Sequence, residues 1–160
     1  MKTLITLLYF SLLLPVATAA QSKQKAEKDF VNQLNSILKN SSEHDHWLQT
    51  GTMTIDSAFA INKAGILSLT VRHTDDDSSF VRARMEAPIN KIQRIAYDLY
   101  LILEYKTDEV TVFKSATNSN ELIEDHKTNY LHIGAPWPED MKHQEKLQKL
   151  LDKLLVFYKN

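Results

Sequence analysis

The sequence predicts an α+β fold: an antiparallel curved sheet or barrel with a C-terminal amphipathic helix and an extra N-terminal helix. Three observations lead to this class. Residues 21–40 repeat apolar side chains at helical spacing, and so do residues 139–159. The stretch between them, about 50–133, alternates apolar and polar residues in short runs separated by turn residues. Strands enclosed by terminal helices indicate one mixed domain.

Residues 1–20 have the pattern of a secretory signal peptide. Its parts follow in order: a positive start, an apolar centre, a break and small residues, at Lys2, Leu4–Leu14, Pro15 and Ala17–Ala20. We expect cleavage near Ala19 or Ala20, which leaves a single mature domain over residues 21–160 in the periplasm or outside the cell. The apolar centre is too short to span a bilayer comfortably, so we expect no membrane span after cleavage.

Composition narrows the class of protein further. The chain has 160 residues, no cysteine and a formal net charge of −1. The absence of cysteine excludes disulfides, a lipidated cysteine anchor and thiol catalysis. A small secreted domain without disulfides is more typical of bacteria than of eukaryotes. The near-neutral charge gives no electrostatic argument for binding nucleic acid or an anionic membrane surface.

Both predicted helices have one apolar face. In the N-terminal helix this face consists of Ala26, Phe30, Leu34, Ile37 and Leu38. In the C-terminal helix it consists of Leu147, Leu150, Leu151, Leu154, Leu155 and Tyr158, with Lys146, Lys149, Asp152 and Lys153 outside it. Such stripes usually face a core.

The densest apolar run of the predicted mature chain is residues 87–105, and two templates fit it. As a helix, it would begin at Pro88 and present an apolar face. As a strand, it would place Tyr97, Leu99, Leu101, Leu103 and Tyr105 on one face. Its branched and aromatic residues favour a strand from about Ala96 onward, after an irregular entry. A hairpin then leads into residues 110–113.

Residues 66–73 and 80–87 alternate clearly and predict a hairpin. Leu67, Leu69 and Val71 would point inward from its first strand, and Val81, Ala83, Met85 and Ala87 from its second. Arg72, Arg82 and Arg84 would lie on the outer face, where carboxylates such as Glu86 are their expected partners. The acidic loop between the strands lacks the ligand spacing of a calcium loop.

A metal site is the alternative functional hypothesis. His44, Asp45 and His46 offer imidazole and carboxylate donors, but no third ligand lies at suitable spacing. The other histidines are scattered. We therefore expect no metal and no cofactor, and interpret the segment as a polar linker.

The order of elements resembles pleckstrin-homology-like domains. It places short antiparallel strands first, then Pro88-Ile-Asn-Lys-Ile-Gln-Arg-Ile95 leading into a Tyr-rich strand, a hairpin and a C-terminal amphipathic helix. It also resembles small exported bacterial proteins of unknown function that share this order. The resemblance covers about residues 52–158 and implies a curved sheet or barrel closed by the last helix. Phosphoinositide binding is not carried over, because the early hairpin has only Lys63 and the next loop is acidic. An open sheet with both helices on one face is the alternative.

No catalytic motif is present, and a non-catalytic binding or assembly module of the bacterial cell envelope is the leading hypothesis. Its expected partner is an envelope protein or a small ligand. The expected contact residues are large side chains left on the outer sheet faces after the core is assigned: Tyr100, Ile102, Phe80 and Phe113. The competing hypothesis is a small metal-dependent enzyme or metal-binding protein that uses the histidine cluster.

Overall fold

The computed structural model describes the backbone of residues 3–43, 51–134 and 142–158, and the side chains of residues 21–43, 51–97, 99–134 and 142–158. The elements are α1 (Thr3–Ser42), β1 (Thr52–Ile61), β2 (Ile66–Thr74), β3 (Phe80–Pro88), the 3-10 helix η2 (Ile89–Lys91), β4 (Ile92–Asp98), β5 (Tyr100–Tyr105), β6 (Val110–Lys114), β7 (Ile123–Thr128), β8 (Tyr130–Gly134) and α2 (Lys142–Leu155).

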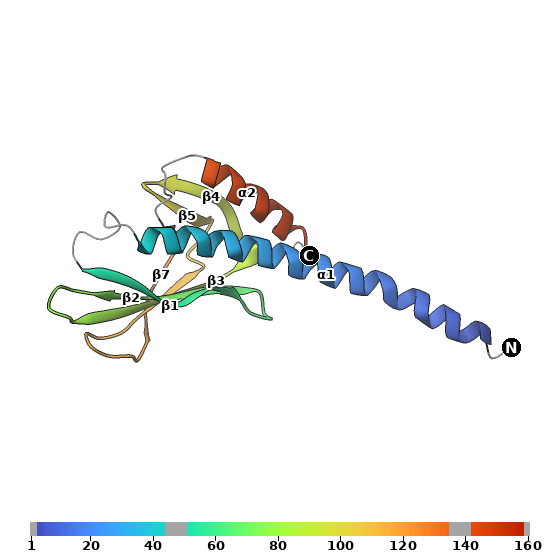
Figure 1. Ribbon diagram of the computed structural model, residues 1–160, viewed down its shortest axis with the longest axis horizontal. Coiled ribbons are helices and arrows are strands. Elements are labelled where there is room, and N and C mark those ends of the chain that lie inside the picture. The colour runs from blue at the N-terminus through green and yellow to red at the C-terminus, as the bar shows by residue number, and fades with distance from the viewer. Residues whose placement is uncertain (1–2, 44–50, 135–141, 159–160) are drawn as a thin grey trace.

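The strands form two antiparallel sheets. Sheet A has the order β1-β2-β3-β6-β7, and sheet B has the order β4-β5-β8. The predicted α+β class, with a helix at each end of the chain, is therefore confirmed. Within the described residues the sheets do not close into a barrel. The helices α1 and α2 lie together against them, and the part of α1 nearest the N-terminus extends away from the rest of the chain (Figure 1).

The central run is extended rather than helical, as predicted, but it is not one continuous strand. Leu99 separates β4 from β5, with Asp98 and Tyr100 paired across the turn. Its φ is 59° and its side chain is 77% exposed, so the predicted inward position of Leu99 is wrong. Turns with left-handed backbone usually contain glycine or asparagine. Because leucine stands at this position, the sequence did not indicate the turn.

The irregular entry to this run explains the spacing of three between its isoleucines. Ile89 starts η2, where residues three apart lie on the same side. The register of β4 against β5 then shifts between Ile92 and Arg94, so that Ile92 and Ile95 both turn inward. All three isoleucines are buried.

The apolar face of α1 fills the space between the two sheets. Phe30, Leu34, Ile37 and Leu38 are all buried, as predicted. The helix contacts β1, an edge strand of sheet A, and β8, an edge strand of sheet B. The leucine stripe of α2 is buried at Leu147, Leu151 and Leu154 against α1 and β4. Both helices are therefore part of one core.

Amide side chains of the helices bind the backbone of two edge strands. Asn35 of α1 accepts from the Phe59 N–H at 2.7 Å and donates to the Phe59 carbonyl at 3.0 Å. On α2, Gln148 accepts from the Ile95 N–H at 2.8 Å, and Gln144 donates to the Ile95 carbonyl at 3.0 Å. Phe59 lies on β1 and Ile95 on β4, so each helix satisfies backbone groups that an edge strand otherwise leaves unpaired.

Tyr158, the last described residue, contacts α1. The Tyr158 hydroxyl donates to the Glu27 carboxylate at 2.7 Å, and the Lys23 ammonium lies 4.2 Å from the Tyr158 ring centroid. Gly65, in the β1–β2 turn, has a φ of 75°, and a Cβ there would lie 2.8 Å from the Tyr158 ring. A glycine is needed at this turn for both reasons.

We predict that Asn35→Leu destabilises the fold by about 1–3 kcal/mol, because it leaves the Phe59 N–H and carbonyl without partners. Urea unfolding monitored by circular dichroism measures the change. Asn32→Leu is the matched control, since Asn32 is exposed on the same helix. Equal unfolding midpoints for the two variants would show that the Asn35 bridge contributes nothing to stability.

Candidate functional site: an apolar cleft between the sheets

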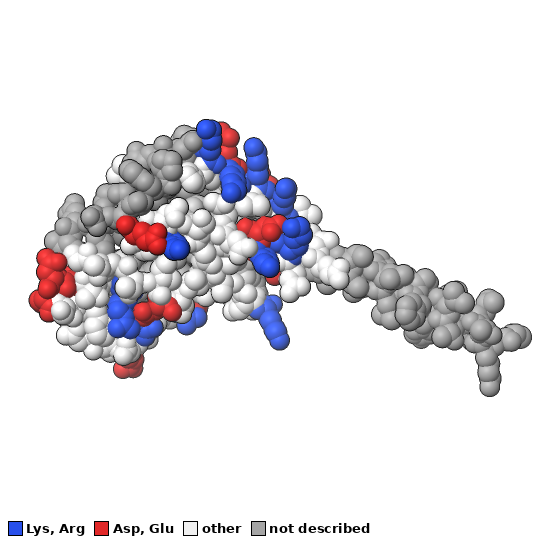
Figure 2. All heavy atoms as spheres, viewed as in Figure 1, with Lys and Arg blue, Asp and Glu red and all other residues white. Residues whose placement is uncertain are grey.

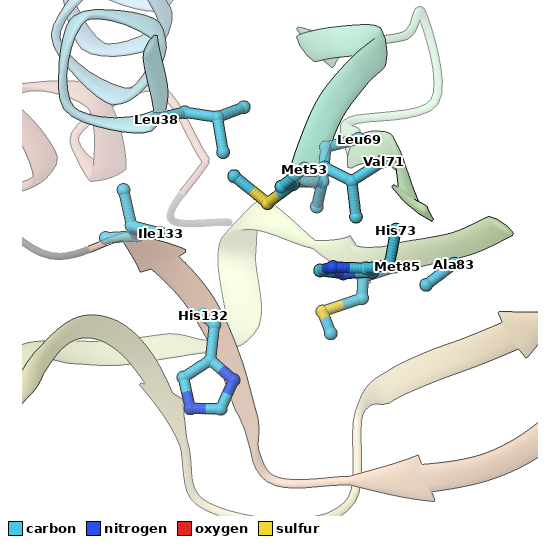
Figure 3. A pocket seen from close by; sticks show the side chains of 9 residues that line it. All are labelled: Leu38, Met53, Leu69, Val71, His73, Ala83, Met85, His132 and Ile133. Carbon is cyan, nitrogen blue, oxygen red and sulfur yellow. The ribbon is translucent and has the colours of Figure 1, made fainter. Parts of the chain in front are cut away.

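An apolar cleft of about 130 Å³ lies between sheet A and strand β8. Figure 3 shows the side chains that line it, which come from α1, β1, β2, β3 and β8: Leu38, Met53, Leu69, Val71, His73, Ala83, Met85, His132 and Ile133. Seven of these nine residues are apolar, and the two histidines are its polar members. An apolar cavity of about this size can hold a single aromatic ring.

Strand alternation and register place the sheet A side of the cleft. Val71 pairs with Ala83, Leu69 with Met85, and all four point to the inner face of sheet A. The small Ala83 side chain leaves space that a larger residue would fill. Met85 is unbranched and polarisable, so it can adapt to different occupants.

His73 is the polar group on the sheet A wall. It follows Leu67, Leu69 and Val71 in the inward row of β2 and is half-buried. Burial lowers the pKa of His73, and the negative charge of Asp75 raises it by a smaller amount. The imidazole is therefore neutral at pH 7, with one nitrogen able to donate a hydrogen bond and the other able to accept one.

His132 connects the cleft to an aromatic surface on sheet B. Its ring lies 5.8 Å from the Tyr100 ring in an edge-on arrangement and 5.1 Å from the Tyr130 ring. Ile102 is the register partner of His132. We call Tyr100, Ile102, Tyr130 and His132 the aromatic face. Tyr130 is 41% exposed, and the other three side chains are half-buried.

The four residues expected to bind a partner do not form one patch. Tyr100 and Ile102 lie on the aromatic face, next to the cleft. Phe80 and Phe113 lie on the outer face of sheet A, in register with Thr74 and Arg84, respectively. The alternation that predicted an outward direction for all four could not show that they belong to different sheets.

The arginine row of sheet A is held by a carboxylate that the sequence pattern did not indicate. Asp56 occupies a bulge in β1, where the register shifts between Ile55 and Ser57. Arg82 Nε lies 2.6 Å and Arg72 Nε 3.3 Å from its carboxylate oxygens. Burial raises the pKa of Asp56, but the hydrogen bonds and charges of the two guanidinium groups outweigh it, so the pKa is lowered. One carboxylate thus binds both guanidinium groups, which leaves the cluster with one net positive charge.

The other two arginines of the chain, Arg84 and Arg94, are also paired. Arg84 forms an ion pair with Glu86, as expected from the sequence, and Arg94 binds Glu104 at 2.7 Å. Arg72 also lies over the Phe80 ring, 4.5 Å from its centroid. Phe80 is therefore covered in part by a guanidinium group.

The proposed metal ligands His44, Asp45 and His46 lie outside the described residues. Among the residues that are described, no group of three histidine, aspartate or glutamate side chains has a metal-binding arrangement. In the same part of the chain, no helix is long and apolar enough to cross a membrane.

The chain matches no protein-family model, and neither the curated proteins nor the solved structures contain a match to it.

The cleft itself was not predicted from the sequence. His73 could have indicated it, because this polar residue follows Leu67, Leu69 and Val71 on the inward face of β2.

We predict that His73 makes stability fall as pH decreases. Its folded pKa lies below the ordinary value of 6.5, so below that value the unfolded chain binds the proton more tightly and unfolding is favoured. Melting temperatures measured between about pH 7.5 and pH 5.5 should therefore drop more for the parent than for His73→Gln. Parallel pH profiles for the two proteins would contradict the assignment.

Proposed function

We propose that this chain is an exported, non-catalytic binding module of the bacterial cell envelope that takes an apolar group into the cleft between its sheets. The observation that carries the proposal is an apolar cleft, in a fold whose core is otherwise well buried, beside the partly exposed aromatic face. The ligand is either a small apolar molecule or an apolar side chain of an envelope protein.

The chemistry of the lining supports binding rather than catalysis. The described lining residues include neither a carboxylate nor a hydroxyl or thiol nucleophile. A histidine general base needs a substrate proton in reach and usually a group that orients its ring. The His73 ring instead adjoins Val71, Met85 and Ala83, which suit a ligand with an apolar body and at most one hydrogen-bonding group.

The aromatic face suits the second part of such a ligand. Tyr100, Tyr130 and His132 form a cluster of partly exposed rings, a kind of surface enriched at binding sites. A ligand that enters the cleft past His132 would extend over these rings. Two of the residues expected from the sequence, Tyr100 and Ile102, belong to this surface.

Export is supported by the order of residues in the N-terminal segment. A positive residue, a leucine-rich centre, a proline and small residues precede Gln21. Lys23 and Glu27 of α1 contact Tyr158, and among the described side chains of α1 the first buried one is Phe30. Cleavage near Ala19 or Ala20 would leave these contacts in place.

We predict that benzene and 1-butanol, used as small apolar probes, bind in the cleft and shift the methyl signals of Met53 and Met85 in NMR spectra. Ala83→Leu adds three carbon atoms that fill the space, and it should weaken probe binding at least about 10-fold, which corresponds to about 1.4 kcal/mol.

Ala58→Leu is the matched control, because Ala58 is exposed on β1 and does not line the cleft. Melting curves verify that both variants are folded. Probe binding that is unchanged in Ala83→Leu, or absent from the parent, would refute a ligand site in this cleft.

A further inference from the structure

One face of α2 carries a row of lysines. Lys142, Lys146, Lys149 and Lys153 are separated by four, three and four residues, which places them on the same side of a helix. The leucine stripe of α2 faces the core from another side, and all four lysines are exposed. From first to last the row is about 17 Å long at 1.5 Å per residue.

The row continues onto α1. A groove of about 290 Å³ between the helices is lined by Ser22, Lys25, Ala26, Asp29, Leu150, Lys153 and Phe157. Lys25 and Lys28 also border the adjoining surface of α1. We call these six lysines, together with Leu150 and Phe157, the lysine face. Figure 2 shows basic side chains gathered over α2 and near the place where α1 leaves the domain.

Three of the six lysines on this face carry a charge that no described carboxylate compensates. Lys146, Lys149 and Lys153 form no ion pair or hydrogen bond with any described residue. Two carboxylates, Asp29 and Glu145, share the surface with six lysines, and Asp29 is bound to Lys25 at 3.2 Å. The chain as a whole has a net charge of −1, so its charges are strongly separated.

We propose that the lysine face binds the headgroups of an anionic phospholipid bilayer, with α2 lying along the membrane surface. Flexible lysines with long apolar stems are suited to this position, because the stems pack on apolar surface while the ammonium groups reach phosphate. Leu150 and Phe157 are half-buried between lysines and provide apolar contact at the level of the headgroups.

The position of α1 favours a bilayer over nucleic acid. The leucine-rich N-terminal part of α1 leaves the domain close to the C-terminal end of α2, so before cleavage the segment directed to the membrane during export adjoins the lysine face (Figure 1). Arginine is the preferred residue for nucleic-acid recognition, whereas Arg72, Arg82, Arg84 and Arg94 lie elsewhere and are bound to carboxylates. This inference does not depend on the cleft or its ligand.

The test is co-sedimentation of the full chain with vesicles of phosphatidylcholine alone and of an equimolar mixture with phosphatidylglycerol. The ratio of the two partition constants isolates the electrostatic part, since the apolar N-terminal segment contributes to both. We expect the ratio to exceed 1 at low salt and approach 1 at high salt. The triple variant Lys146→Gln, Lys149→Gln, Lys153→Gln should lower it roughly 10- to 100-fold.

The matched control is Lys106→Gln, Lys114→Gln, Lys127→Gln, which changes the net charge equally on β-strands and turns away from α2. It should keep the parent ratio. An equal loss in both triples, or a parent ratio of 1, would overturn the proposal. Tighter binding of duplex DNA than of mixed vesicles, dependent on the same three lysines, would also overturn it and assign the face to nucleic acid.

Discussion

The packing of α1 between the edges of the two sheets is the interaction on which the rest of the structure depends. Four large side chains, Phe30, Leu34, Ile37 and Leu38, are buried there, and together contribute about 6–12 kcal/mol if each contributes about 1.5–3. The fit to β8 is close: a Cβ at Gly134, whose φ is 150°, would lie 2.8 Å from the Ser41 Cβ. Without α1, the inner faces of both sheets would be exposed along one side, and the edge backbone of Phe59 would lose the partner that Asn35 provides.

The cleft follows from the same arrangement. It lies near the C-terminal end of α1, where Leu38 is the one residue of that helix in its lining. The opposing wall is built from β2 and β3, whose inward row includes the small Ala83 and the flexible Met85. The part of α1 that packs between the sheets thus leaves a gap at its C-terminal end. The gap is lined by adaptable side chains, which is a property of binding sites as much as of loosely packed cores.

The spacing of apolar residues along the sequence predicted the elements whose buried face depends on that spacing alone. Periods of 3.6 and 2 residues predicted most of the apolar face of each helix and the inward row Leu67, Leu69 and Val71, and these side chains are buried. Leu150, which was predicted on the core-facing stripe, is only half-buried and lies beside lysines. The features that were not predicted depend on unusual local backbone or on contacts between residues far apart in the sequence. The turn at Leu99 uses a residue that rarely adopts positive φ, and the bulge that exposes Asp56 to Arg72 and Arg82 has no sequence mark. The cleft and the division of Tyr100 and Phe80 between sheets depend on how strands far apart in the chain are assembled.

The net charge of −1 gave no indication of the lysine face, because it sums charges that lie on different surfaces. On α2 the side chains are sorted by face. Leucines face the core, Gln144 and Gln148 bind the edge of β4, and lysines face outward. The two proposed surfaces are separated along α1. The lysine face includes Lys25 and the cleft includes Leu38, thirteen residues further along α1 and therefore about 20 Å away. The lysine face and the cleft therefore lie at different places along α1 and share no residue.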